Sequence, residues 1–181
     1  MTVATEVLTG TWEAEAHHSS IEAGARHMGV GSFRTRFDDV VARLEARDGE
    51  LRVTGEARVE SIAIRSPRQF REHVVYGEDF LDARRFPTIR FESSAVELSV
   101  GGKARVAGEL TIRGVTRPVV ATGAFRPPVE DPYGRVRLGL DLTASIDRRD
   151  FGLDWQATLP GGGDVLGWDV ELDVRLELVR A

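Results

Sequence analysis

Four histidines are the side chains best suited to metal or proton chemistry in this chain of 181 residues. His17 and His18 are adjacent, so on a predicted strand they point to opposite faces and cannot ligate one ion together. His27 lies on the same strand or its continuation, whereas His73 lies in a segment with helical periodicity. No His-Glu-x-x-His or comparable ligand spacing occurs. Hydrogen-bonded structural histidines are therefore the default interpretation, and we predict no metal site and no cofactor.

Other motifs that could support catalysis lack the partners that such chemistry needs. Asp150-Phe151-Gly152 matches the magnesium-binding triplet of protein kinases, but the glycine-rich phosphate loop and the catalytic His-Arg-Asp are absent from the sequence. The run Gly161-Gly162-Gly163 lacks the Lys and Ser/Thr that follow the glycines of a phosphate-binding loop. Serines such as Ser61 are not set in a nucleophile elbow. We therefore predict that the protein is not an enzyme.

Length and composition restrict the remaining classes. A chain of this size is ordinary for one domain, which we predict over residues 1–181. The formal charge of −5 argues against general affinity for nucleic-acid phosphates. Met1 to Thr11 carries no secretory signal, and no segment approaches the roughly 20 apolar residues of a membrane helix. We expect a cytoplasmic protein that does not span a membrane, unless an export leader has been trimmed from the sequence.

Alternating side chains along most of the sequence predict long antiparallel strands. In the last such segment Val170, Leu172, Val174 and Leu176 alternate with charged residues, which puts the apolar set on one face. A strand of about 11 residues spans roughly 36 Å, whereas the usual strand of about five or six residues spans roughly 17–20 Å. Long strands with one wet face favour a barrel whose apolar side chains line the interior. A small outer-membrane barrel is excluded because its interior could not hold so many charges.

One segment departs from this period of two and predicts a short helix over residues 67–76. Ser66 fits an N-cap, with Pro67 at the first helical position and Gly77 as the stop. Phe70 and Val74 would share one face of this helix.

One segment of the sequence predicts a hairpin: Leu110-Thr111-Ile112-Arg113-Gly114-Val115-Thr116-Arg117-Pro118-Val119 reads as strand, glycine turn and strand. These residues closely resemble the central hairpin of the YceI-like family of lipid-binding proteins. Four more short motifs resemble motifs of this family and occur in the same order, and together they are spread over almost the whole chain. They are His18-Ser19-Ser20-Ile21 with Arg26-His27-Met28, Asp79-Phe80-Leu81-Asp82, Phe86-Pro87-Thr88-Ile89-Arg90-Phe91, and Arg148-Arg149-Asp150-Phe151-Gly152.

The resemblance implies an all-β, eight-stranded antiparallel, lipocalin-like barrel with a short α-helix, and an interior that binds a polyisoprenoid or another long-chain amphiphile such as a quinone or fatty-acid derivative. Ala23 and Ala25 stand where similar proteins usually carry larger residues, which would widen the cavity. The expected lining comprises Ala23, Ala25, Phe33, Phe80, Phe86, Phe91, Leu110, Ile112, Phe125, Leu140, Phe151, Trp155 and Trp168. The expected polar residues near the mouth are His18, Arg26, Arg148 and Asp150.

Several alternatives stay open at this point. Arg148 and Asp150 would share a face on a strand, so they could form a structural ion pair as well as contact a headgroup. An enzyme acting on an isoprenoid would need perturbed polar groups deep in the barrel, and a haem or metal carrier would need an inward-facing histidine. An interaction module would have a barrel filled by its own side chains, and a homodimer is compatible with each of these cases.

Overall fold

The computed structural model describes residues 8–99 and 101–181. The first seven residues, which bear on the expected absence of a leader, lie outside this range. The strands of the described part are β1 (Gly10–Ala14), β2 (Ser20–His27), β3 (Gly31–Phe37), β4 (Val40–Arg47), β5 (Glu50–Arg58), β6 (Thr88–Leu98), β7 (Lys103–Ile112), β8 (Val115–Glu130), β9 (Val136–Asp147) and β10 (Leu166–Arg180). The helix α1 covers Arg68–Tyr76, and short 3-10 turns cover Ala16–His18, Val59–Ser61 and Arg148–Phe151.

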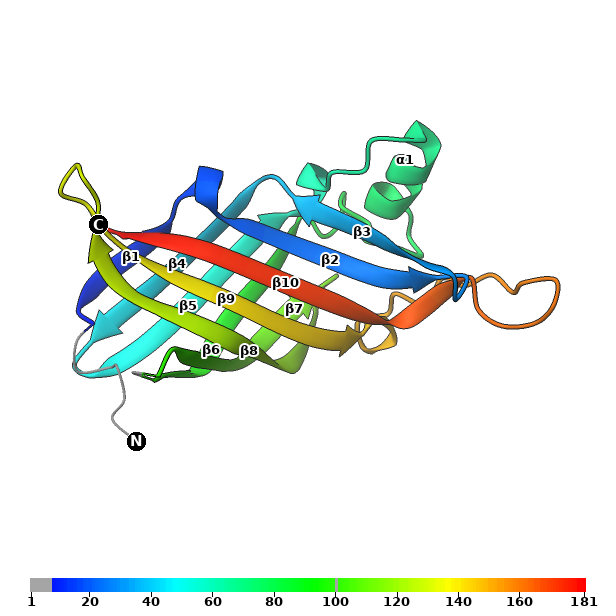
Figure 1. The fold of residues 1–181 in the computed structure, drawn as a ribbon. Coiled ribbons are helices and arrows are strands. Elements are labelled where there is room, and N and C mark those ends of the chain that lie inside the picture. The colour runs from blue at the N-terminus through cyan, green and yellow to red at the C-terminus, as the bar shows by residue number, and fades with distance from the viewer. Residues whose placement is uncertain (1–7, 100) are drawn as a thin grey trace.

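Pairing between β1 and β10 closes the sheet into a barrel (Figure 1). In the described residues the closed ring contains eight antiparallel strands, in the order β1, β4, β5, β6, β7, β8, β9 and β10. The hairpin of β2 and β3 extends this ring, because β2 pairs with the first part of β10 and β1 pairs with its last part. The predicted all-β, eight-stranded, lipocalin-like barrel with one short helix is confirmed.

The side chains of β10 point to the faces of the sheet that their alternation predicts. Val170, Leu172, Val174 and Leu176 face the barrel interior, whereas Glu171 approaches Arg34 at 3.5 Å on the outer surface. The alternation fails only near the start of the strand, where a bulge lies between Leu166 and Val170 in the pairing with β2. A bulge changes which face the following side chains meet.

A glycine in β7 allows two strands to approach closely inside the barrel. Gly108 lies between Val106 and Leu110 on the inward face, and a Cβ added to it would lie 2.6 Å from the ring of Phe91. The neighbouring pairing of β6 with β7 is irregular between Ser93 and Ala95. Glycine is needed here because any side chain would meet the Phe91 ring and the β6 backbone.

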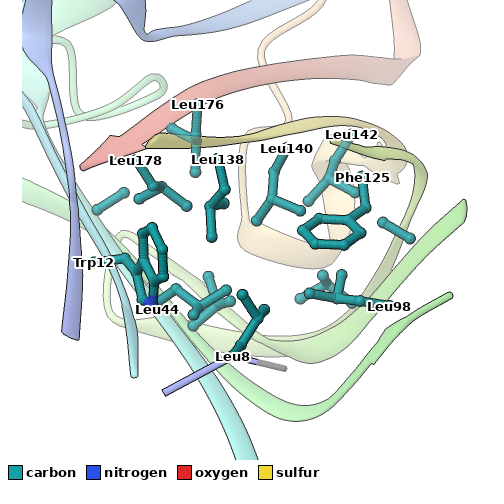
Figure 2. Close-up of a cluster of buried hydrophobic side chains, with 14 of the residues drawn as sticks. Leu8, Trp12, Leu44, Leu98, Phe125, Leu138, Leu140, Leu142, Leu176 and Leu178 are labelled. Carbon is teal, nitrogen blue, oxygen red and sulfur yellow. The ribbon is translucent and has the colours of Figure 1, made fainter. Parts of the chain in front are cut away.

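One half of the barrel is filled by its own side chains (Figure 2). Figure 2 shows leucines of β9 and β10 pointing toward Trp12 of β1 and Leu44 of β4. We call the following six side chains the plug, because each is exposed by 2 % or less: Trp12, Leu44, Leu98, Leu138, Leu140 and Leu178. Interiors packed this densely leave few voids larger than a water molecule, so the barrel is solid at this end.

The helix α1 covers the other half of the barrel beside β3 (Figure 1). It confirms the predicted helix, but Pro67 is its N-cap rather than its first residue, because the Pro67 backbone is extended at φ −73° and ψ 156°. Val74 and Val75 are buried, and Phe70 stays more than one third exposed. Among the described residues no helix is both long and apolar enough to cross a bilayer.

Arg137 at the start of β9 ties together the strands that close the barrel. Its guanidinium lies 2.7 Å from Glu15, 2.6 Å from Glu177 and 2.7 Å from Asp131. The hydrogen bonds from Arg137 lower the pKa of Glu15 from 4.5 to about 2 and that of Asp131 from 3.8 to about 2. Both carboxylates therefore favour the folded state at any pH at which they are ionised.

We expect acid to unfold the protein through these carboxylates. Because their pKa values are lower in the folded state, the stabilisation is complete above the ordinary pKa values of 4.5 and 3.8 and is lost as the pH falls toward about 2. The melting temperature should fall as the pH is lowered from about 6 to about 2. Arg137→Gln should make this dependence of the melting temperature on pH less steep. Arg43→Gln removes an exposed pair with Glu13 and is the matched control; an equal slope in wild type and Arg137→Gln would contradict the prediction.

Candidate functional site

A cavity of about 700 Å³ occupies the half of the barrel that the plug does not fill. This volume falls within the roughly 300–1,000 Å³ typical of pockets that enclose one small molecule. Side chains of every strand from β2 to β10 line it, and nearly all of them are apolar. The cavity is therefore suited to a hydrophobic ligand.

Small side chains explain why this half is hollow. Ala23 and Ala25 of β2 line the cavity, and Ala57, Ala121 and Ala144 line it from β5, β8 and β9. An alanine does not reach the barrel axis, whereas the leucines and Trp12 of the plug meet across it. Whether an eight-stranded barrel is filled or holds a ligand depends on the size of these inward side chains.

The mouth of the cavity lies beside β3, which is the last strand of the extended sheet and has α1, not another strand, next to it (Figure 1). Phe33 of β3 and Phe70 of α1 meet edge to face, with ring centroids 5.5 Å apart. Phe80 packs against Trp155 at 5.3 Å and against His73 at 4.9 Å. These aromatic contacts hold α1 and the segment before β10 around the opening.

Arg148 lies at the mouth with only 3 % of its surface exposed. Its guanidinium donates hydrogen bonds to four backbone carbonyls, those of Leu153, Trp155, Leu166 and Gly167, at 2.5 to 3.2 Å. Burial lowers the pKa of Arg148, and the nearby Asp147 carboxylate acts in the opposite direction. The side chain therefore fastens the segment between β9 and β10, and its donors are already engaged.

The alternative of an ion pair between Arg148 and Asp150 is wrong. Both residues belong to a 3-10 turn rather than a strand, so a spacing of two does not put them on one face. The pair that forms is Arg149 with Asp147, which also accepts the backbone N–H of Arg149 at 2.9 Å. These bonds lower the pKa of Asp147 from 3.8 to about 2.

The structure places nine of the candidate residues along the cavity wall. They are Ala23, Ala25, Phe33, Phe80, Phe91, Leu110, Ile112, Trp155 and Arg148.

The other expected lining residues lie elsewhere. Phe125 and Leu140 face inward but belong to the filled half. Phe151 is buried in the cluster that packs α1 onto the barrel, and Phe86 packs under the turn at Gly114. Trp168 falls at the bulge of β10, where the guanidinium groups of Arg148 and Arg149 lie 4.2 and 4.8 Å from its ring centroid.

Three expected polar residues also lie away from the cavity wall. His18 is exposed on a 3-10 turn, where its Nδ1 lies 2.6 Å from Glu15. Arg26 and Asp150 are exposed as well. The placement of His17 and His18 on a strand is wrong, because residues 16–18 form that turn between β1 and β2. Arg26 has the parity of the outer face, opposite to Ala25.

Sequence reasoning missed several polar residues on the cavity wall, among them His27 and Thr35. His27 shares the inward face of β2 with Ala23 and Ala25, so the period of two already contained this signal. Its imidazole has no hydrogen-bond partner within the described residues, and the Thr35 hydroxyl is buried without one. A ligand oxygen at the mouth could bond to either group.

Metal and catalytic chemistry find little support in the described residues. Glu15, His18 and Glu177 offer ligand atoms within 4.8 Å of one another. Arg137 already bonds to both carboxylates, however, and its positive charge disfavours a cation there. At the cavity border Glu56 and Arg90 bond to each other at 2.8 Å. The largely apolar wall is suited to binding a hydrocarbon chain.

Comparisons with known proteins agree with this geometry. The family description of the YceI-like domain matches residues 12–178. A UPF0312 protein of Pseudomonas fluorescens is 31 % identical over 148 residues, which cover 77 % of this chain and 74 % of the relative. A Pseudomonas putida relative is 26 % identical over 171 residues, 93 % of this chain and 84 % of the relative.

Solved structures show the same fold. BcnA of Burkholderia cenocepacia superposes with a TM-score of 0.72 at 20 % identity, over 93 % of this chain and 99 % of that chain. A polyisoprenoid binding domain from Saccharophagus degradans superposes with a TM-score of 0.63 at 11 % identity, over 96 % of this chain and 99 % of that chain. The match over residues 12–178 covers most of the sequence, and the chain belongs to the YceI-like family.

Proposed function

We propose that this protein binds and carries a long-chain amphiphile of the polyisoprenoid class without transforming it. The observation that carries the proposal is the apolar cavity of about 700 Å³ inside the barrel. Similarity in fold to a polyisoprenoid binding domain is in keeping with it. The apolar chain would occupy the cavity, and the headgroup would remain at the mouth near His27.

The energetics favour a long chain over a short one. Each methylene removed from water contributes about 0.8 kcal/mol, so about ten of them contribute roughly 8 kcal/mol. Association itself costs about 4–15 kcal/mol in lost motion and ordering. A short chain would do little more than offset this cost, so tight binding requires a chain that uses the whole cavity.

An interaction module, an enzyme and a haem carrier would each need features other than an apolar cavity. An interaction module with a filled barrel would not need a cavity of this size, and an enzyme would need free polar groups in its depth. His27 is the inward-facing histidine that a haem carrier would require. A visible absorption spectrum of the purified protein tests that case, because bound haem absorbs strongly.

We expect organic extraction of the protein, purified from its own host, to release one long-chain lipid per chain. Native mass spectrometry before extraction should show the same mass difference on the intact protein. The physical reason is that the wall of the cavity is apolar, so a ligand gains binding free energy there mainly by burying its own apolar surface. Recovery of a polar metabolite or a nucleotide as the stoichiometric ligand would contradict the proposal.

A further inference from the structure

Five buried side chains of the filled half also line the wall of the cavity. They are Ala42 of β4, Val53 of β5, Val106 of β7, Leu142 of β9 and Leu176 of β10. They come from five of the eight strands of the ring, so they form a layer where the filled half of the barrel meets the cavity. We call this layer the floor of the cavity.

The cavity ends at the floor. None of the six side chains of the plug is among the residues that line the cavity. Leu44 and Leu140 are 0 % exposed, and Leu98 and Leu178 are 1 % exposed, as expected for side chains packed in the filled half. The cavity is therefore a blind pocket with its opening near α1.

The pocket is long and narrow. Along β10 its wall runs from Leu166 to Leu176, which is about 33 Å of strand at about 3.3 Å per residue. With strands tilted by about 35–45°, this corresponds to about 25 Å along the barrel axis. A volume of about 700 Å³ spread over that length leaves room for one hydrocarbon chain in cross-section.

We propose that the floor sets the length of the chain that this protein accepts. The inference rests on the proposed function. The ligand enters tail first, its end meets the floor, and any further carbons stay in water at the mouth. An extended chain advances about 1.25 Å per C–C bond, so about 20 main-chain carbons fill about 25 Å. With four main-chain carbons per isoprene unit, the best ligand has about five units, or about 25 carbons.

A variant that raises the floor tests this assignment. Ala121 of β8 lies directly opposite Val106 of the floor, and it borders the open part of the cavity. Because Ala121 packs against the filled half and also lines the cavity, Ala121→Phe should place a ring on the floor and shorten the pocket. Thr122→Phe adds the same ring to the outer face of the same strand and is the matched control, since Thr122 is exposed. If Ala121→Phe does not fold, Val174→Phe raises the floor from β10, where Val174 pairs with Leu142.

The measurement is a competition between all-trans isoprenoid alcohols of three to eight isoprene units, offered to the delipidated protein at equal concentration. Native mass spectrometry then gives the relative occupancy of each chain length. For the wild type and Thr122→Phe we expect occupancy to rise at least tenfold from three units to about five, with no further gain. For Ala121→Phe the break should move by at least one unit toward shorter chains.

The outcomes separate this inference from the proposed function. If the wild type binds every length equally, or if Ala121→Phe weakens all lengths equally without moving the break, the floor does not set the length and the inference is overturned, although lipid binding stands. If no alcohol of any length binds to the wild type, the proposed function itself fails.

Discussion

Ala25→Phe is expected to weaken binding of a long-chain lipid by at least about 100-fold. Ala25 lies on the inward face of β2, opposite Val170 and Phe33, and between the mouth and the floor. A phenyl ring at this level would keep the tail out of the deeper part of the cavity. Excluding as few as about four methylenes, each contributing about 0.8 kcal/mol, already accounts for a 100-fold loss.

The stability of Ala25→Phe distinguishes a hollow barrel from a filled one. A ring that enters an existing cavity meets no overpacking, whereas the same ring in a filled core costs about 1–3 kcal/mol. We therefore expect the delipidated variant to melt within about 3 °C of the delipidated wild type, which corresponds to less than about 1 kcal/mol for a chain of this size. Titration with a fluorescent long-chain lipid measures the affinity.

Glu22→Phe, on the outer side of the same strand, is the matched control for the added ring. It should bind lipid as the wild type does, because Glu22 pairs with Arg36 and Asp173 outside the cavity wall. Unchanged affinity in Ala25→Phe would show that the ligand does not pass Ala25. A large loss of stability with no measurable lipid binding in the wild type would instead return the protein to the class of interaction modules.

Arg148→Leu is expected to destabilise the fold by about 3 kcal/mol or more. The arginine is 3 % exposed and donates to four carbonyls that would lose these bonds. Each buried polar group left without a partner costs about 1–3 kcal/mol. For a chain of this length, 3 kcal/mol lowers the melting temperature by about 6–12 °C.

Hydrogen exchange should locate this effect. The amides of residues 152–167 should exchange faster in Arg148→Leu, because the side chain holds this segment onto β10. Arg149→Leu is the matched control: it also removes a guanidinium near Trp168, but its pair with Asp147 is exposed and such pairs contribute about 1 kcal/mol or less. Equal melting temperatures for the two variants would contradict the structural role of Arg148.

Much of the fold was predictable because strand periodicity is a local property. Val170 to Leu176 face inward as their alternation predicts, and Gly114 sits in the β7–β8 turn with φ 72°. The helix was predictable to within one residue, because Pro67 and Gly77 mark its ends. Each of these features depends on neighbours in the sequence, so no tertiary information is needed to read them.

The candidate site was only half predictable. Periodicity separates inward from outward positions, so it put Ala23 and Ala25 on one face, and that face lines the cavity. It could not separate Phe91 from Phe125, because both face inward and only their height along the barrel decides which of them meets the cavity. That height follows from the pairing register, which joins residues far apart in the chain.

The sequence by itself determined the all-β class, the facing of the strands, the helix and the family. Only the tertiary structure decided that the plug fills one half of the barrel and that the other half is a blind cavity. It also shows that Arg148 donates to backbone carbonyls of the segment before β10, and that Trp168 lies at the bulge of β10 rather than on the cavity wall. The physical reason is that alternation specifies a face, whereas a cavity depends on which side chains from different strands meet across the same level of the barrel.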